Sequence, residues 1–138
     1  MRDMDSQLGD GGMPLLGAIG LSFESYGDGW SEARWDPTEM ASNLFGIVHG
    51  GVYGVVLDAA MNFALNAALE RGDRASTLQL QYSMPRGAKQ GDPLRVRGEV
   101  ARLARSVAFV EATVRDADGD VVASATATFS IKRREPTP

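Results

Sequence analysis

Residues 43–58 read Asn-Leu-Phe-Gly-Ile-Val-His-Gly-Gly-Val-Tyr-Gly-Val-Val-Leu-Asp, and this stretch decides how the fold of the chain is interpreted. Apart from Gly54, residues 51–69 contain no helix breaker and no turn cluster, so they are predicted to form one long helix. A helix that opens at Gly50 presents unpaired backbone N–H groups and a partial positive charge at its end. Asp58 lies about two turns further in, at about 1.5 Å of rise per residue. An anion-stabilising helix end near a carboxylate suits acyl-transfer chemistry.

The composition predicts one domain of an ordinary globular type. The chain has 138 residues, of which 43% are hydrophobic and 23% are charged, and this length is sufficient for a proper core. The net charge of −4 argues against nucleic acid as a general partner. Because the chain has no cysteine, neither disulfides nor thiol chemistry are expected.

The sequence contains no pattern that indicates a membrane segment. The most apolar stretch is interrupted by Asp58, Asn62 and Asn66, so no run reaches the roughly 18 residues that a membrane span needs. The N-terminus begins with the charged residues Arg2 and Asp3 and lacks the layout of a signal peptide. We therefore expect a cytoplasmic protein without a membrane partner.

Strand patterns flank the predicted helix on both sides. Residues 21–26 and 30–35 enclose Gly27-Asp28-Gly29, which is typical of a hairpin. After the helix, apolar and polar residues alternate with period two, which predicts four consecutive strands in an antiparallel meander with one solvated face. These alternating segments are residues 78–84, 94–101, 108–115 and 123–131.

The predicted elements combine into a single α+β domain over residues 13–132. Residues 13–21 are expected to form a short helix or a turn before the first strand. Residues 1–12 are polar and Gly-rich, and residues 133–138 are basic and then Pro-rich, so both ends are expected to be flexible.

The helix-entry motif and this layout resemble the hotdog-fold acyl-CoA thioesterase family, in its phenylacetate-degradation (PaaI-like) branch. The resemblance covers roughly residues 14–132, and the sequence of residues 81–94, Gln-Tyr-Ser-Met-Pro-Arg-Gly-Ala-Lys-Gln-Gly-Asp-Pro-Leu, is similar to a strand end and a Gly-Asp turn of that family. It implies a hotdog fold, an antiparallel sheet of about six strands wrapped around one long central helix. It also implies homo-oligomers, either dimers or tetramers, with the active sites at the dimer interface.

The resemblance assigns catalytic roles to four residues. It matches the catalytic carboxylate to Asp58 and the backbone N–H that polarises the thioester carbonyl to Gly50, which follows His49. The amide that orients water or substrate matches Asn43. His49 is expected to hold the loop so that the N–H of Gly50 points correctly, and without a second histidine or any cysteine a zinc site is not expected.

Further residues are assigned to substrate binding. Gly51 adjoins the oxyanion donor, and a hydroxyl residue of the strand after the helix falls at Ser76 or Thr77. Arg86 and Arg105 are our choices among the basic residues near turns for the phosphates of coenzyme A.

The resemblance implies an acyl-CoA thioesterase that hydrolyses an aryl- or fatty-acyl-CoA to the free acid and CoA. Asp58, contributed by the partner subunit, would deprotonate water or attack the carbonyl itself, and the sequence leaves both routes open. No metal or organic cofactor is implied. For two of the residues a structural role stays open instead of a catalytic one. Asp58 could accept a hydrogen bond from a neighbouring loop, and Asn43 could cap its own loop. Two other functions stay open as well, a non-catalytic acyl-CoA-binding hotdog domain and a hotdog dehydratase or hydratase.

Overall fold

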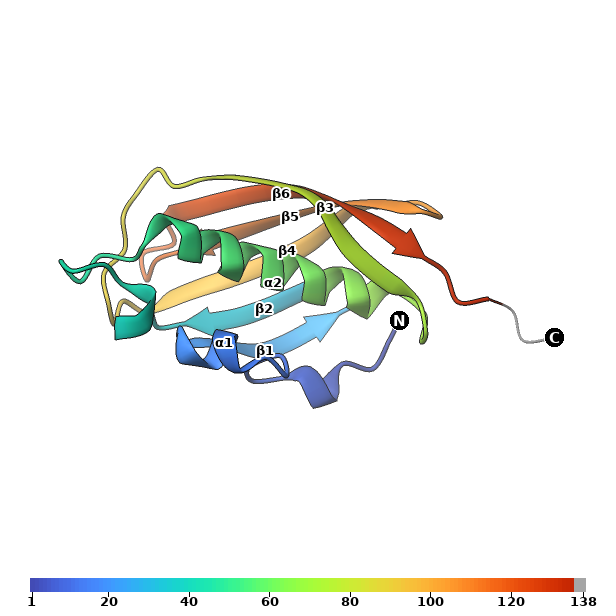
Figure 1. Ribbon diagram of the computed structural model, residues 1–138, viewed down its shortest axis with the longest axis horizontal. Helices are drawn as coiled ribbons and strands as arrows, with labels where there is room; N and C mark the ends of the chain where they lie inside the picture. The colour runs from blue at the N-terminus through green and yellow to red at the C-terminus, as the bar shows by residue number, and fades with distance from the viewer. Residues whose placement is uncertain (136–138) are drawn as a thin grey trace.

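The long helix α2 (Gly50–Ala68) lies across one face of a six-stranded antiparallel sheet in a computed structural model that describes residues 1–135 (Figure 1). The strand order in the sheet is β1-β2-β4-β5-β6-β3. This arrangement confirms the predicted α+β architecture. No helix within the described residues is long and apolar enough to span a bilayer. The remaining elements are η1 (Asp5–Gln7), α1 (Pro14–Ala18), β1 (Leu21–Gly27), β2 (Trp30–Trp35), η2 (Glu39–Ala41), β3 (Arg74–Ser83), β4 (Leu94–Leu103), β5 (Val107–Arg115) and β6 (Val121–Lys132).

The backbone of α2 approaches the sheet closely at β2 and β4. The hydroxyl of Ser31 on β2 donates a hydrogen bond of 2.8 Å to the carbonyl of Ala60 on α2. A Cβ atom added to Gly98 on β4 would overlap the same carbonyl oxygen, so only glycine fits at this position. Ala60, Ala64 and Ala67 are fully buried against the sheet, as expected from the small residues of the helix. The contact fixes how α2 sits on the sheet and so where its residues lie.

The prediction of a four-strand meander is wrong for β3. Strands β4, β5 and β6 do follow one another in the sheet, but β3 pairs with β6 and forms the edge of the sheet. The place beside β4 is taken by β2, whose Trp35 pairs with Leu94. Period-two alternation shows which face a side chain occupies, but it does not identify the neighbouring strand.

The predicted alternation is also wrong at Leu78 of β3. The register of β3 against β6 shifts between Thr77 and Gln79, which leaves Leu78 as an extra residue in the strand. Its side chain is 65% exposed instead of facing the core. A bulge of this kind re-aims the neighbouring side chains, and it places Thr77 on the helix side of the sheet.

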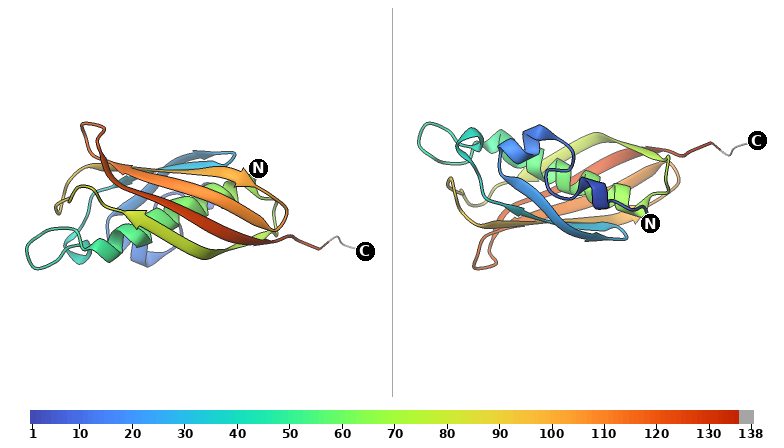
Figure 2. Two further views of the ribbon diagram at one scale, coloured as in Figure 1. Left: turned by 90° about the horizontal axis from the view of Figure 1, so that it is seen from above. Right: turned by 90° about the horizontal axis from the view of Figure 1, so that it is seen from below.

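The N-terminal residues run alongside α2 on the helix-bearing side of the sheet (Figure 2). The backbone N–H of Arg2 donates to the last turn of α2 at 2.9 Å, and Met4 is buried in the core. Gly9 forms an antiparallel bridge to Phe23 of β1 and so covers this edge of the sheet. Flexibility is a property of motion, so the expected flexibility of residues 1–12 stays a prediction.

Asp73, between α2 and β3, ties the end of the sheet to the start of the tail. Its carboxylate accepts hydrogen bonds from the backbone N–H of Arg134 at 2.8 Å and from the guanidinium of Arg133 at 3.1 Å. The Arg134 N–H is the main reason why the pKa of Asp73 is lowered, with Arg133 acting in the same direction. The predicted flexible tail, residues 133–138, lies partly outside the described residues.

Candidate active site

The first turn of α2 presents a free backbone donor. His49 is the N-cap residue, with an extended backbone, and its Nδ1 accepts a hydrogen bond of 3.0 Å from the N–H of Gly51. Within residues 1–135, no group accepts a hydrogen bond from the N–H of Gly50. This donor lies at the positive end of a helix of 19 residues. It can therefore bind a carbonyl oxygen or an oxyanion.

The loop before α2 is shaped by Asn43. The side-chain oxygen of Asn43 accepts hydrogen bonds from the N–H groups of Phe45 at 2.8 Å and Ile47 at 3.2 Å. Asn43 therefore makes the contacts expected of a loop-capping residue, which is the structural alternative to its role in catalysis. At the tip of this loop the side chains of Leu44 and Phe45 are 99% and 84% exposed.

A second loop, residues 85–93, braces the first one. The N–H of Val48 donates to the carbonyl of Ala88 at 2.9 Å, and the N–H of Gln90 donates to the carbonyl of Gly46 at 2.9 Å. The N–H of Ala88 in turn donates to the hydroxyl of Tyr53 on α2 at 3.0 Å. Burial raises the pKa of Tyr53, so this phenol stays neutral. The helix end is thus held by two loops.

Tyr82 of β3 is a site residue that the sequence analysis did not identify. Its hydroxyl donates a hydrogen bond of 3.0 Å to the carbonyl of Gly50. Its ring lies so close to α2 that a Cβ added to Gly54 would come within 2.9 Å of it. Gly54 is the one helix breaker within the predicted helix. A glycine at such a position indicates close approach of a neighbouring element, and here that neighbour is Tyr82.

Asp58 lies half-buried in the middle of α2 and is held by one hydroxyl. The side chain of Thr77 on β3 donates a hydrogen bond of 2.8 Å to Oδ1 of Asp58. Ser76 is exposed and pairs with Ser130 of β6, so its side chain lies on the other face of the strand. Of the two predicted hydroxyl residues, the structure brings only Thr77 to the carboxylate.

A mainly apolar groove of about 400 Å³ runs beside Asp58. One side of the groove comes from α2, and the other comes from the N-terminal segment, α1 and β1. Its lining residues are Gln7, Gly11, Met13, Leu15, Leu16, Phe23, Val55, Asp58, Ala59, Asn62, Phe63 and Asn66.

Gly50 and Asp58 do not meet within one chain. They are separated by eight positions of one helix, which corresponds to about 12 Å along its axis. A reacting carbonyl must lie about 3 Å from both its donor and its base or nucleophile. One chain therefore cannot supply both groups to the same thioester.

Comparison with known proteins shows the family of the chain. The sequence profile of the thioesterase superfamily matches residues 45–123. The chain belongs to the thioesterase superfamily. The matched residues include the end of the loop before α2, the whole of α2, and both Asp58 and Thr77.

Individual relatives confirm the hotdog fold of the chain. A Ralstonia eutropha structure, described as a thioesterase-like phenylacetic acid degradation-related protein, is 34% identical, with a TM-score of 0.77 over 86% of this chain and 90% of that one. A Saccharolobus solfataricus protein, provisionally named as an esterase, is 26% identical over 86% of this chain and 78% of its own length. A Streptococcus mutans structure bound to acetyl CoA is 23% identical, with a TM-score of 0.76 over 84% of this chain and 91% of that one.

The two arginines chosen for coenzyme A lie at opposite ends of the thioesterase sheet. Arg86 follows β3 and forms ion pairs with Asp120 at 2.8 Å and Asp116 at 3.5 Å in the β5–β6 turn. Arg105 lies in the β4–β5 turn, where its carbonyl accepts a hydrogen bond from Arg133. The carboxylates of Asp116, Asp118 and Asp120 lie within 4.8 Å of one another, and Arg86 offsets part of their charge.

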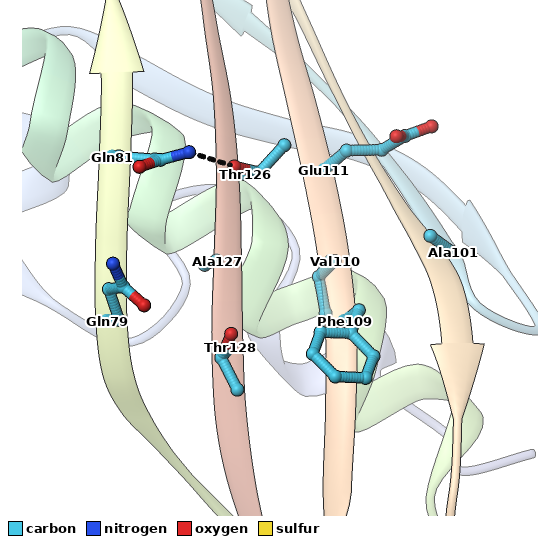
Figure 3. Close-up of a pocket in the computed structure, with 9 residues that line it drawn as sticks. All are labelled: Gln79, Gln81, Ala101, Phe109, Val110, Glu111, Thr126, Ala127 and Thr128. Carbon is cyan, nitrogen blue, oxygen red and sulfur yellow. Dashed lines mark hydrogen bonds between the residues drawn. The ribbon is translucent and has the colours of Figure 1, made fainter.

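A second hollow of about 300 Å³ lies on the outer face of the thioesterase sheet (Figure 3). Gln81 donates a hydrogen bond of 3.3 Å to Thr126 there, and the ring of Phe109 is partly exposed beside them. Neither Asp58 nor the first turn of α2 reaches this hollow. It is therefore not part of the candidate active site.

Proposed function

We propose that this chain hydrolyses an aryl- or fatty-acyl-CoA thioester to the free acid and coenzyme A. The observation that carries the proposal is the free N–H of Gly50 at the positive end of α2. A donor in this position stabilises the oxyanion that forms when a nucleophile attacks a thioester carbonyl, and losing such a donor typically costs about 10²–10³ in rate. The half-buried carboxylate of Asp58 supplies the base or nucleophile.

The active site is proposed to form between two copies of the chain. Because Gly50 and Asp58 are too far apart within one helix, Gly50 of one chain would work with Asp58 of another. Among residues 1–135, the free edge of the sheet is β3, which carries Thr77, whereas Gly9 covers the edge at β1. Pairing of two β3 edges would join two sheets and bring the two helices together. Dimers or tetramers built from such pairs would both be compatible with a shared site.

In one proposed route, Asp58 removes a proton from water and the resulting hydroxide attacks the thioester carbonyl. The oxyanion is held by the Gly50 N–H, and its collapse expels the thiolate of coenzyme A. In the other route, the carboxylate itself attacks the carbonyl and the intermediate expels the thiolate of coenzyme A, and water then hydrolyses the mixed anhydride to the free acid and the regenerated carboxylate. Thr77 would keep the carboxylate in position in both routes, and Asn43 would orient the water or the carbonyl.

Coenzyme A is the proposed carrier of the acyl group. The Streptococcus mutans relative, which shares the fold, binds acetyl CoA. In the present chain, Arg86 and Arg105 are proposed to contact the phosphates. Since they lie at opposite ends of the sheet, a ligand in a shared site would meet Arg86 of one chain and Arg105 of the other.

The experiment that tests the proposal is thiol release from a panel of aryl-, medium-chain and long-chain acyl-CoAs. Asp58→Asn should keep the fold and lose at least about 10²-fold in turnover, the usual scale for a general base. The matched control is Asp28→Asn, which changes an exposed carboxylate in the β1–β2 turn. A folded Asp58→Asn variant with near-wild-type turnover would contradict the assignment.

The same panel separates the other two functions. A non-catalytic binding domain would bind acyl-CoA without releasing thiol. A dehydratase or hydratase would change the acyl chain without releasing thiol, and it would need a histidine–acid pair. The single histidine instead caps α2 through its contact with Gly51, which favours the hydrolase.

A further inference from the structure

We infer that the N-terminal segment, residues 1–13, forms one wall of the acyl-binding groove and that Met13 helps to select the acyl group. The inference rests on the proposed function, because it assigns the groove beside Asp58 to the acyl part of the thioester. Gln7, Gly11 and Met13 line this groove opposite residues of α2. The catalytic carboxylate and the N-terminal segment therefore face the same space.

The N-terminal segment is anchored to α2 at its beginning. The guanidinium of Arg2 donates to the side chain of Asn66 at 2.9 Å, to the carbonyl of Glu70 at 2.5 Å and to the carbonyl of Asp73 at 2.7 Å. A cation at the C-terminal end of a helix is favoured by the helix dipole. Asn66, which Arg2 holds, itself lines the groove. The anchor and the groove are thus directly connected.

The segment has further anchors along its length. Met4 is fully buried, and its N–H donates to the hydroxyl of Tyr26 on β1 at 2.9 Å. Gly9 and Phe23 exchange two backbone hydrogen bonds, with N–O distances of 2.9 and 2.6 Å. Gly11 has a φ of +70°, and a Cβ there would touch the side chains of Leu16 and Phe23. A wall held at so many points can discriminate between ligands.

The chemistry of the groove fits an apolar acyl group of limited size. Its lining is mainly apolar, with carboxamides from Gln7, Asn62 and Asn66. Its volume of about 400 Å³ is at the lower end of the range for small-molecule sites, about 300–1,000 Å³. This size favours a medium-chain or aryl acyl group over a long chain. The side chain of Met13 is 51% exposed and would gain contacts when such a group binds.

The selectivity test compares kcat/KM for decanoyl-CoA with kcat/KM for acetyl-CoA. Met13→Ala should lower this ratio by about fivefold or more, since one missing methylene in an apolar pocket already changes discrimination by about tenfold or more. Met13→Leu keeps the apolar volume and should restore most of the ratio. Met40→Ala is the matched control, because Met40 is an exposed methionine outside the groove. An unchanged ratio in Met13→Ala would overturn the inference.

A second measurement does not depend on turnover. S-decyl-CoA, a thioether that cannot be hydrolysed, is titrated into protein with ¹³C-labelled methionine methyl groups. The signal of Met13 should shift, and the signal of Met40 should not. Binding that leaves Met13 unchanged, or no binding at all, would overturn the inference even if the protein hydrolyses acyl-CoA. If no acyl-CoA is hydrolysed but Met13 still responds, the proposed reaction fails while the groove assignment stands.

Discussion

The hydroxyl of Thr77 donates a hydrogen bond of 2.8 Å to the carboxylate of Asp58 and so connects the edge strand β3 to the middle of α2. The bulge at Leu78 comes directly after Thr77 and separates it from the second half of the strand, residues 79–83. The only described side-chain hydrogen bond to Asp58 therefore comes from the strand that is also the free edge of the sheet. The position of the carboxylate depends on the conformation of this edge.

Thr77→Val tests this relationship, because valine has nearly the shape of threonine but lacks the donor. A hydrogen bond to a charged group contributes about 1.5–3 kcal/mol, so we expect kcat to fall by roughly 10- to 100-fold. Ser76→Ala is the matched control, since Ser76 lies on the other face of β3, and it should change kcat little. Steady-state kinetics with a thermal unfolding curve for each variant provide the measurement. The opposite pattern, with Ser76→Ala impaired and Thr77→Val active, would assign the hydroxyl role to Ser76.

Gly50→Pro tests the proposed oxyanion donor with little change to the helix. Proline has no N–H, yet it is favoured at the first position of a helix. The preceding residue, His49, already has the extended φ and ψ of −64° and 135° that proline requires of it. A Cβ at position 50 would make only ordinary contact with the side chain of Met84 at 3.6 Å. We therefore expect the helix to form and kcat to fall by about 10²–10³.

Gly50→Ala is the control for this prediction, because it adds a Cβ but keeps the N–H. Its kcat should stay much closer to wild type than that of Gly50→Pro. Circular dichroism checks that α2 is intact in both variants. Equal losses in the two variants would indicate that the side chain, and not the donor, causes the effect.

The elements around the site differ in how far the sequence could predict them. The long helix begins one residue before its predicted start, and β4, β5 and β6 follow the predicted alternation. The loop before α2 was predicted as well, because His49 and the two glycines that follow it form a local pattern. These features depend on residues that are close together in the chain.

The features that the sequence did not predict depend on contacts between distant residues. The bulge at Leu78 and the placement of β3 beside β6 follow from how strands pair, which local alternation does not encode. The contacts that Arg2 and Met4 make with α2 and β1 join residues far apart in the chain, and the polar, Gly-rich composition of residues 1–12 does not encode them. Tyr82 reaches the first turn of α2 over 32 residues of sequence.

Asp73→Asn should lower the melting temperature in a pH-dependent way. The pKa of Asp73 is lowered in the folded protein, chiefly by the N–H of Arg134 and also by Arg133. The ionised carboxylate therefore stabilises the fold above the unfolded-state pKa of about 3.9, and this stabilisation is lost as the pH falls through the folded-state pKa. The difference in Tm between wild type and Asp73→Asn should be full near neutral pH and should shrink below about pH 4. Asp28→Asn, at an exposed turn, is the control, and a Tm difference that does not depend on pH would contradict this account.

A shared active site makes a prediction about mixed dimers. Asp58→Asn and Gly50→Pro should each be nearly inactive as homodimers, because both of their sites lack one essential group. In a heterodimer, the intact Gly50 of the first variant meets the intact Asp58 of the second, so one of the two sites is complete. Co-expression with two different affinity tags isolates this heterodimer, and it should recover about half of the wild-type activity per dimer. Light scattering of the wild type should give a mass of at least twice 14.7 kDa. A monomer, or a heterodimer as inactive as its parents, would show that the two residues do not act across an interface.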